Sequence, residues 1–67
     1  MQIIETLNAV RIVANESGRF AIQEQMQDGT WDETASYRYG NLHGCQVTAR
    51  AMSAENDRID SYENAHR

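Results

Sequence analysis

The sequence of 67 residues contains no lysine, no proline and a single cysteine, Cys45. One cysteine excludes a disulfide within the chain, and a zinc site could draw only on Cys45, His43, His66 and carboxylates. Without lysine the chain cannot form a Walker-type phosphate loop, which needs GxxxxGK followed by Ser or Thr. The absence of proline and of any repeat gives no sign of a linker. We therefore expect one small domain spanning residues 1–67, with no cofactor and no bound metal.

Long apolar runs and a basic N-terminal region are also missing. The opening residues, MQIIETLN, carry no positive side chain, and no segment reaches the roughly 20 apolar residues that a membrane-spanning helix needs. A lone thiol is typical of a reducing compartment. These features predict a soluble cytoplasmic protein that does not contact a membrane.

Positive charge is scarce and dispersed. Six arginines face ten acidic residues, which gives a net charge of -4. The arginines stand at positions 11, 19, 38, 50, 58 and 67. Direct nucleic-acid binding is not expected, because it requires clustered cations. An acidic chain suits a basic protein surface, including the grooves with which other proteins hold nucleic acid, although the same charge also keeps a small protein in solution.

Alternating hydrophobicity predicts three strands. The first two, at about 8–14 and 19–27, are separated by the turn ESG at 16–18. Asp28-Gly29 predicts a type I′ hairpin turn, because both residues tolerate positive φ. A third strand is expected at about 30–39. Residues 1–7 leave two alternatives open, since they either lengthen the first strand or pair with a second copy of the protein.

From Asn41 the hydrophobic period becomes helical. A helix is predicted at about 42–60 with Asn41 as its N-cap. Its apolar stripe contains Leu42, Cys45, Ala49, Met52 and Ile59. Covering one face of a three-stranded antiparallel meander with this helix gives an α+β fold of the order βββα. Trp31 is expected to fill the space between sheet and helix, facing Ala49 and Met52.

No set of residues forms a complete catalytic site. His43 and Cys45 are two residues apart on the predicted helix, so their side chains diverge, and Cys45 falls on the apolar stripe. Paired carboxylates need a cleft that separates their pKa values, which a chain this short rarely closes. We therefore predict that the protein is not an enzyme.

Acidic residues form two groups, around the second turn and along the end of the helix. They are either solvated surface or a partner-binding surface. Tyr39 joins the candidates because it is the aromatic residue expected to be most exposed. The candidate partner-binding residues are Asp28, Asp32, Glu33, Tyr39, Glu55, Asp57 and Asp60.

The predicted meander (RIVANESGRFAIQEQMQDGTW) followed by a helix (GNLHGCQVTARAM) resembles small acidic accessory proteins of phages and prophages, including compact anti-CRISPR proteins. The resemblance rests on size, charge and element order, and it transfers no site residue. It implies a non-enzymatic inhibitor that occupies the basic surface of a host protein or ribonucleoprotein complex in the host cytoplasm. The alternative is a self-associating module, a homodimer formed through the N-terminal segment or a sheet edge.

Overall fold

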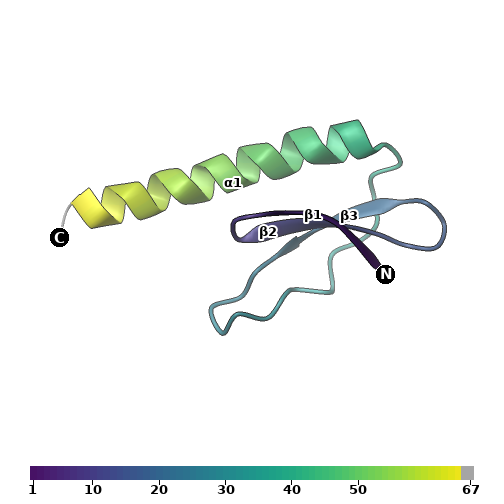
Figure 1. The fold of residues 1–67 in the computed structure, drawn as a ribbon, viewed down its shortest axis with the longest axis horizontal. Coiled ribbons are helices and arrows are strands. Elements are labelled where there is room, and N and C mark those ends of the chain that lie inside the picture. Colours follow the sequence, from purple (N-terminus) through teal and green to yellow (C-terminus); the bar gives the residue numbers. More distant parts are fainter. Residues whose placement is uncertain (66–67) are drawn as a thin grey trace.

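The structure is a computed structural model that describes the backbone of residues 1–65 and the side chains of residues 1–55. Three antiparallel strands precede one helix (Figure 1). The elements are β1 (Gln2–Leu7), β2 (Val10–Ala14), β3 (Phe20–Glu24) and α1 (Leu42–Ala65). The strands follow one another in the sheet in the order β1-β2-β3, and α1 packs on one face. The predicted α+β fold with the order βββα is confirmed.

The first strand of the sheet comes from the N-terminal residues, whose role the sequence pattern did not decide. β1 and β2 form a hairpin joined by the two residues at 8–9. Asn8 has φ 54, a left-handed conformation that asparagine tolerates better than most residues. Its side-chain amide donates a hydrogen bond of 2.9 Å to Ser53 Oγ on α1. The predicted strand at 8–14 is therefore β2 with two turn residues before it.

The prediction of a strand at 30–39 is wrong. Instead, an irregular segment follows β3 and meets the edge of that strand only near its two ends. Tyr39 exchanges backbone hydrogen bonds of 2.8 and 3.1 Å with Phe20, and the Asp32 N–H donates to the Glu24 carbonyl at 2.9 Å. Between these ends, no backbone hydrogen bond joins residues 33–38 to β3 in the described chain.

Local hydrogen bonds from two aspartates explain why this segment is not a strand. Asp32 Oδ1 accepts the Thr34 N–H at 3.0 Å and also the Thr34 hydroxyl, and Asp28 accepts the same two groups of Thr30. Such side-chain bonds compete with the regular pairing of a sheet. The type I′ turn is wrong as well, because Gly29 has φ 90 whereas Asp28 does not adopt positive φ.

The core lies between the sheet and α1. Val10 and Ile12 of β2 pack with Cys45 and Ala49 of α1, and all four are fully buried. Partly buried side chains surround them, namely Leu7, Phe20, Ile22, Tyr39, Leu42 and Met52. This packing confirms the predicted helix stripe as far as Met52, while Ile59 lies outside the described side chains.

Helix α1 begins at the predicted residue and continues past the predicted end. Asn41 Oδ1 accepts the Gly44 N–H at 3.2 Å, which confirms the N-cap. The helix runs to Ala65, five residues beyond 60, and extends past the sheet (Figure 1). In the described part of the chain, no helix combines the length and apolar character required to cross a membrane.

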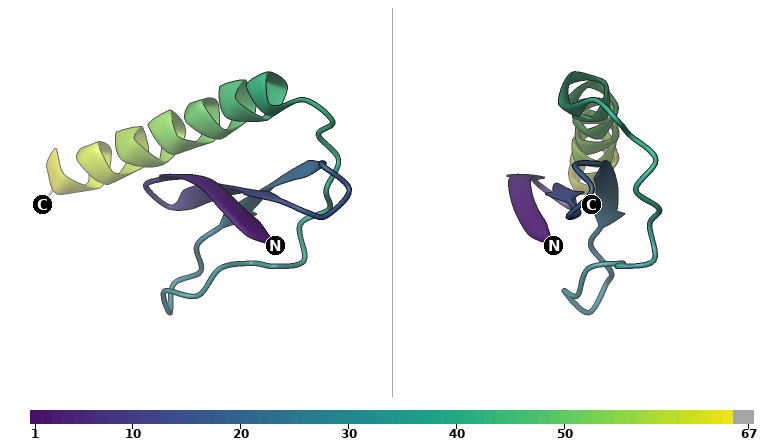
Figure 2. Two further views of the ribbon diagram at one scale, coloured as in Figure 1. Left: turned by 45° about the vertical axis from the view of Figure 1, so that its right-hand side comes forward. Right: turned by 90° about the vertical axis from the view of Figure 1, so that its right-hand side faces the viewer.

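The sheet face opposite α1 carries a buried polar pair and the only tryptophan. The Arg11 Nε donates to Gln23 Oε1 at 2.7 Å, and both side chains are buried. Trp31 lies over the Arg11 guanidinium, so the prediction that Trp31 fills the space between sheet and helix is wrong. The irregular segment leaves β3 on the side away from α1 before it returns to the start of the helix (Figure 2). Trp31 belongs to this segment, and its contact with Arg11 places it on the sheet face opposite α1.

Candidate partner-binding site

A cavity of about 250 Å³ opens where β3, α1 and the irregular segment meet. It is lined by Ile22, Glu24, Asp32, Ala35, Ser36, Arg38, Tyr39 and Met52. The cavity exists because residues 33–38 do not pair with β3. The same local hydrogen bonds that prevent a fourth strand therefore create the space.

The edge of β3 contributes backbone groups to this cavity. Phe20 and Glu24 both form hydrogen bonds on the outer edge of the strand. In an antiparallel strand, every second residue directs its N–H and C=O to the same edge, so the groups of Ile22 also point outward. Within the described residues neither group has a backbone partner on this edge. Ile22 lines the cavity and thus brings one backbone acceptor and one donor to the strand edge there.

Two carboxylates stand at the cavity. The Thr34 hydroxyl, and then the Thr34 N–H, lower the pKa of Asp32 below its ordinary value of 3.8, so this side chain is ionised at neutral pH. Glu24 is exposed at the end of β3. Neither carboxylate forms an ion pair with an arginine whose side chain is described. The two carboxylates are therefore not held in an ion pair by a described arginine, although Arg38 also lines the cavity.

Two arginines act at the cavity wall formed by residues 35–39: Arg19 holds its backbone, and Arg38 offsets part of the negative charge. Arg19 Nε donates to the Tyr37 carbonyl at 2.8 Å, and its Nη2 donates to the Arg38 carbonyl at 3.0 Å. Arg38 lines the cavity, with its guanidinium carbon 5.9 Å from the centre of the Tyr39 ring. Arg19 thus holds the backbone of the segment where it rejoins β3.

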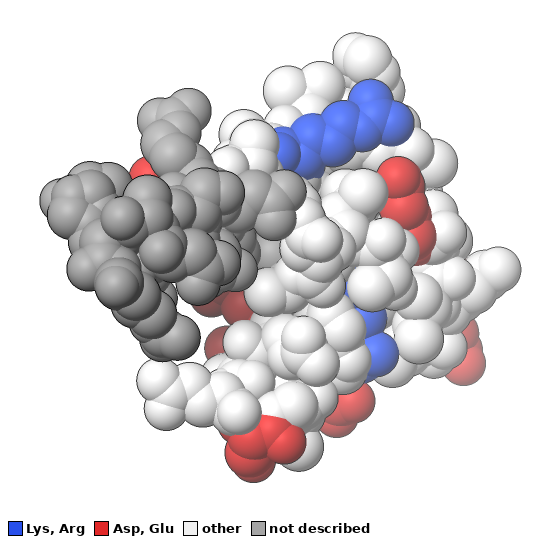
Figure 3. Space-filling model, turned by 60° about the vertical axis from the view of Figure 1, so that its left-hand side comes forward, with Lys and Arg blue, Asp and Glu red and all other residues white. Residues whose placement is uncertain are grey.

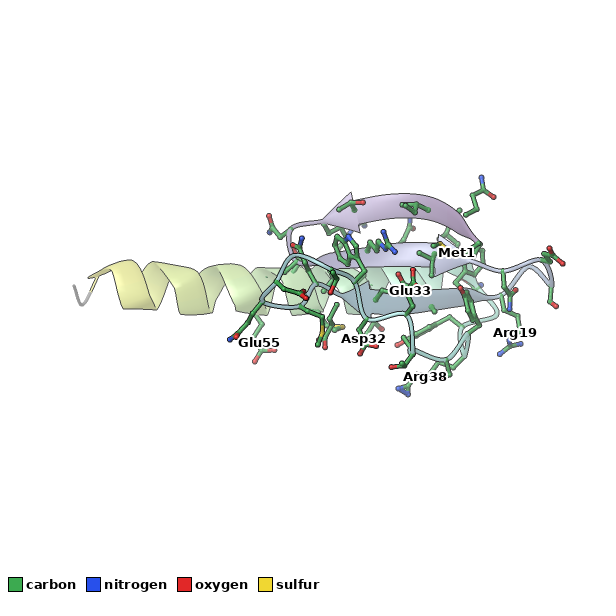
Figure 4. All side chains as sticks on the ribbon, turned by 90° about the horizontal axis from the view of Figure 1, so that it is seen from below. Met1, Arg19, Asp32, Glu33, Arg38 and Glu55 are labelled. Carbon is green, nitrogen blue, oxygen red and sulfur yellow. The ribbon has the colours of Figure 1, made fainter. Side chains whose placement is uncertain are left out.

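The structure brings together some of the residues predicted from the sequence. Asp32 and Tyr39 both line the cavity, and Glu55 lies about one helical turn beyond the lining residue Met52. Figure 4 shows the labelled Glu55, Asp32 and Arg38 projecting from the same side of the molecule.

Other predicted residues lie apart from this site. Asp28 is in the preceding turn, where its carboxylate is held by Thr30. Glu33 turns to the opposite face of the sheet, where its Oε1 is 3.9 Å from Arg11 Nη2. Asp57 and Asp60 lie outside the described side chains.

Sequence reasoning missed Glu24, Ser36 and Arg38. The alternation of β3 contained a signal for Glu24, because Phe20, Ile22 and Glu24 share the face toward α1. No sequence pattern indicated the other two, since their position depends on a segment that was expected to be a regular strand.

His43 and Cys45, the two residues considered for catalysis, lie in different environments. The Cys45 side chain is fully buried, whereas His43 is exposed. Burial raises the pKa of the Cys45 thiol above its ordinary value of 9.0. Among the described residues, no group of three or more His, Cys, Asp or Glu side chains is placed to hold a metal ion.

Charged groups are spaced rather than merged on the face drawn in Figure 3, where arginine atoms and neutral surface separate the carboxylates.

Comparison with models of protein families, with curated proteins and with solved structures gives no match.

Proposed function

We propose that this chain is a non-enzymatic interaction protein that binds a basic surface of a host nucleic-acid-handling complex and inhibits that complex. The observation that carries the proposal is that two carboxylates, Glu24 and Asp32, line one cavity with Tyr39 and form no ion pair with a described arginine. A site of this kind attracts a cationic side chain and also offers it an apolar surface.

Inhibition follows from competition for the same cations. Lysine and arginine side chains that hold nucleic acid do so mainly through phosphate charge. Carboxylates that pair with these side chains remove part of the binding free energy of the nucleic acid. The site requires no chemical step, and its effect weakens as salt concentration rises.

The choice of complex to test comes from the resemblance in size, charge and element order. Phage accessory proteins with these properties act in the host cytoplasm, so a CRISPR effector with its guide RNA is the first complex to test, and the cytoplasm is the proposed compartment.

A charge-reversal experiment tests the proposal. The Glu24→Lys/Asp32→Lys variant is compared with a control variant, Glu16→Lys/Asp28→Lys, which makes the same change of net charge at exposed positions outside the cavity. Target-DNA binding by the purified effector is measured with increasing amounts of each protein. We expect about tenfold weaker inhibition from the cavity variant and little change from the control. Equal inhibition by the two variants would contradict the proposal.

A second candidate function is self-association through β1. β1 is an edge strand of the sheet, and exposed apolar side chains lie beside this edge. They are Met1, Ile3 and Ile4, with exposed fractions of 62%, 51% and 36%. An unpaired edge with apolar side chains is a template for pairing with a second copy. Light scattering at increasing concentration, with Ile3→Lys as the disrupting variant, distinguishes a dimer from a monomer.

A further inference from the structure

The cavity beside β3 has the size of one side chain. Its volume of about 250 Å³ lies below the roughly 300 Å³ at which pockets for small molecules and cofactors begin. The end of a long side chain matches such a space.

The charges of the lining favour a cation. Glu24 and Asp32 contribute two negative charges and Arg38 contributes one positive charge, which leaves a net charge of -1. Ile22, Ala35 and Met52 add apolar side chains to the wall. A side chain with an aliphatic stem and a positive end matches both parts of the lining.

We infer that the cavity binds the guanidinium of one arginine side chain of the partner, an inference that rests on the proposed function. A guanidinium carries five N–H donors in a planar fork, whereas an ammonium is a compact point charge. The lining residues supply more than one kind of acceptor: the carboxylates of Glu24 and Asp32, the Ser36 hydroxyl and the carbonyl of Ile22. A guanidinium therefore has enough donors to serve several acceptors, whereas an ammonium has three.

Arg38, which already lines the cavity, limits how the incoming arginine is held. Arg38 lies 5.9 Å from the centre of the Tyr39 ring, so one guanidinium is already placed at that ring. The incoming group is therefore held by the carboxylates and by the Ile22 carbonyl rather than mainly by stacking.

Three small probes test this inference directly on the whole chain. N-acetyl-arginine methylamide, the corresponding lysine compound and the uncharged citrulline compound are titrated into ¹⁵N-labelled protein at constant ionic strength. We expect saturable shifts of the amide signals of Ile22, Ser36 and Tyr39 with the arginine probe, weaker shifts with lysine and none with citrulline. Shifts spread evenly over the surface, or equal binding of arginine and lysine, overturn the inference.

The chain supplies a matched pair of variants. Asp28 and Asp32 make the same hydrogen bonds to a threonine two residues later, but only Asp32 lines the cavity. Asparagine keeps the oxygen that accepts these bonds and removes the charge. We expect Asp32→Asn to weaken the arginine probe about tenfold and Asp28→Asn to change it less than about twofold. Equal effects of the two variants overturn the inference.

A filling variant separates this inference from the proposed function. Ala35→Leu adds volume at the cavity wall without changing charge, and we expect it to abolish binding of the arginine probe. If it still binds the probe, the assignment of the cavity is wrong. If the wild-type chain binds the probe but inhibits no effector complex, the proposed function fails and the arginine site stands. If Ala35→Leu inhibits the effector as well as wild type does, the proposed function stands and the arginine site is wrong.

Discussion

The guanidinium carbon of Arg11 lies 4.7 Å from the ring centre of Trp31, on the face of the sheet away from α1. Arg11 is 8% exposed and also donates to Gln23 on the neighbouring strand. A buried charge is costly unless it is paired and hydrogen-bonded, and here a ring, an amide oxygen and the nearby Glu33 carboxylate share that role. This contact fastens the irregular segment to the sheet.

Replacing Trp31 therefore tests how much the packing on the sheet face away from α1 contributes to stability, not the core between the sheet and α1. The indole is only partly buried, and a cation–π contact adds about 0.5–2 kcal/mol. We expect Trp31→Ala to lower the free energy of unfolding by about 1–3 kcal/mol, less than the roughly 3–5 kcal/mol typical of a fully buried aromatic residue. Urea denaturation followed by far-UV circular dichroism measures it. Trp31→Phe is the control, since it keeps a ring over Arg11. A loss above about 4 kcal/mol would return Trp31 to the main core.

Hydrophobic periodicity predicted most of the fold, because burial against one helix leaves a clear pattern in the sequence. The alternation in β2 and β3, the Asn41 cap and the stripe through Cys45 and Ala49 are all present in the structure. Residues 30–39 show the same alternation, yet they do not form a strand. There the local hydrogen bonds of Asp32 replace the regular pairing, and periodicity does not report on such competition.

The candidate site was predictable only in part for the same reason. Asp32 and Tyr39 stood out by charge and by their place in the sequence, and both line the cavity. Ser36 and Arg38 reach it because the segment does not pair with β3. In a regular strand Ser36 and Arg38 would point to the face opposite Tyr39, because successive side chains alternate, whereas all three line one cavity in the structure.

Removing one hydroxyl should change the titration of Asp32. The Thr34 hydroxyl and then its N–H lower the pKa of this carboxyl from 3.8, so Thr34→Val removes the larger cause and should raise that pKa. A carboxyl with a lowered native pKa stabilises the fold above its unfolded pKa, and this stabilisation disappears as pH falls through the native value. An NMR titration of the Asp32 side chain measures the shift. Thr30→Val should move Asp28 alone, and a change at Asp32 in that variant would contradict the assignment.

Cys45 should react with a thiol reagent only after unfolding. Its side chain is fully buried, and burial raises its pKa above 9.0, so the native thiol keeps a proton that the unfolded thiol releases. Stability from this group is therefore complete below about pH 9 and declines as pH rises through the native pKa. Titration with a thiol-specific dye, with and without denaturant, checks the first expectation. The loss of stability at alkaline pH is checked with Cys45→Ala as the control, because the stability of that variant should not show this decline. Rapid modification of the native protein would revive the catalytic hypothesis for Cys45.

Asn8 offers the sharpest test of the turn that places β1 in the sheet. It holds φ 54 and donates to Ser53, a side chain that is 8% exposed on α1. Asn8→Gly keeps the backbone conformation and loses this bond, so we expect a loss of about 1 kcal/mol. Asn8→Ala loses the bond and also forces alanine into a left-handed conformation, so the expected loss is about 2–3 kcal/mol.

Thermal and urea denaturation of Asn8→Gly, Asn8→Ala and Ser53→Ala, together with both double variants, separate the two effects. Ser53→Ala should cost less in the Asn8→Gly background than in the wild type, because the bond is already absent there. The difference in stability between Asn8→Ala and Asn8→Gly should be the same with serine or alanine at position 53, since it depends on φ alone. If Asn8→Ala is tolerated as well as Asn8→Gly, φ at Asn8 is not positive in solution. The β1–β2 turn would then have a different geometry.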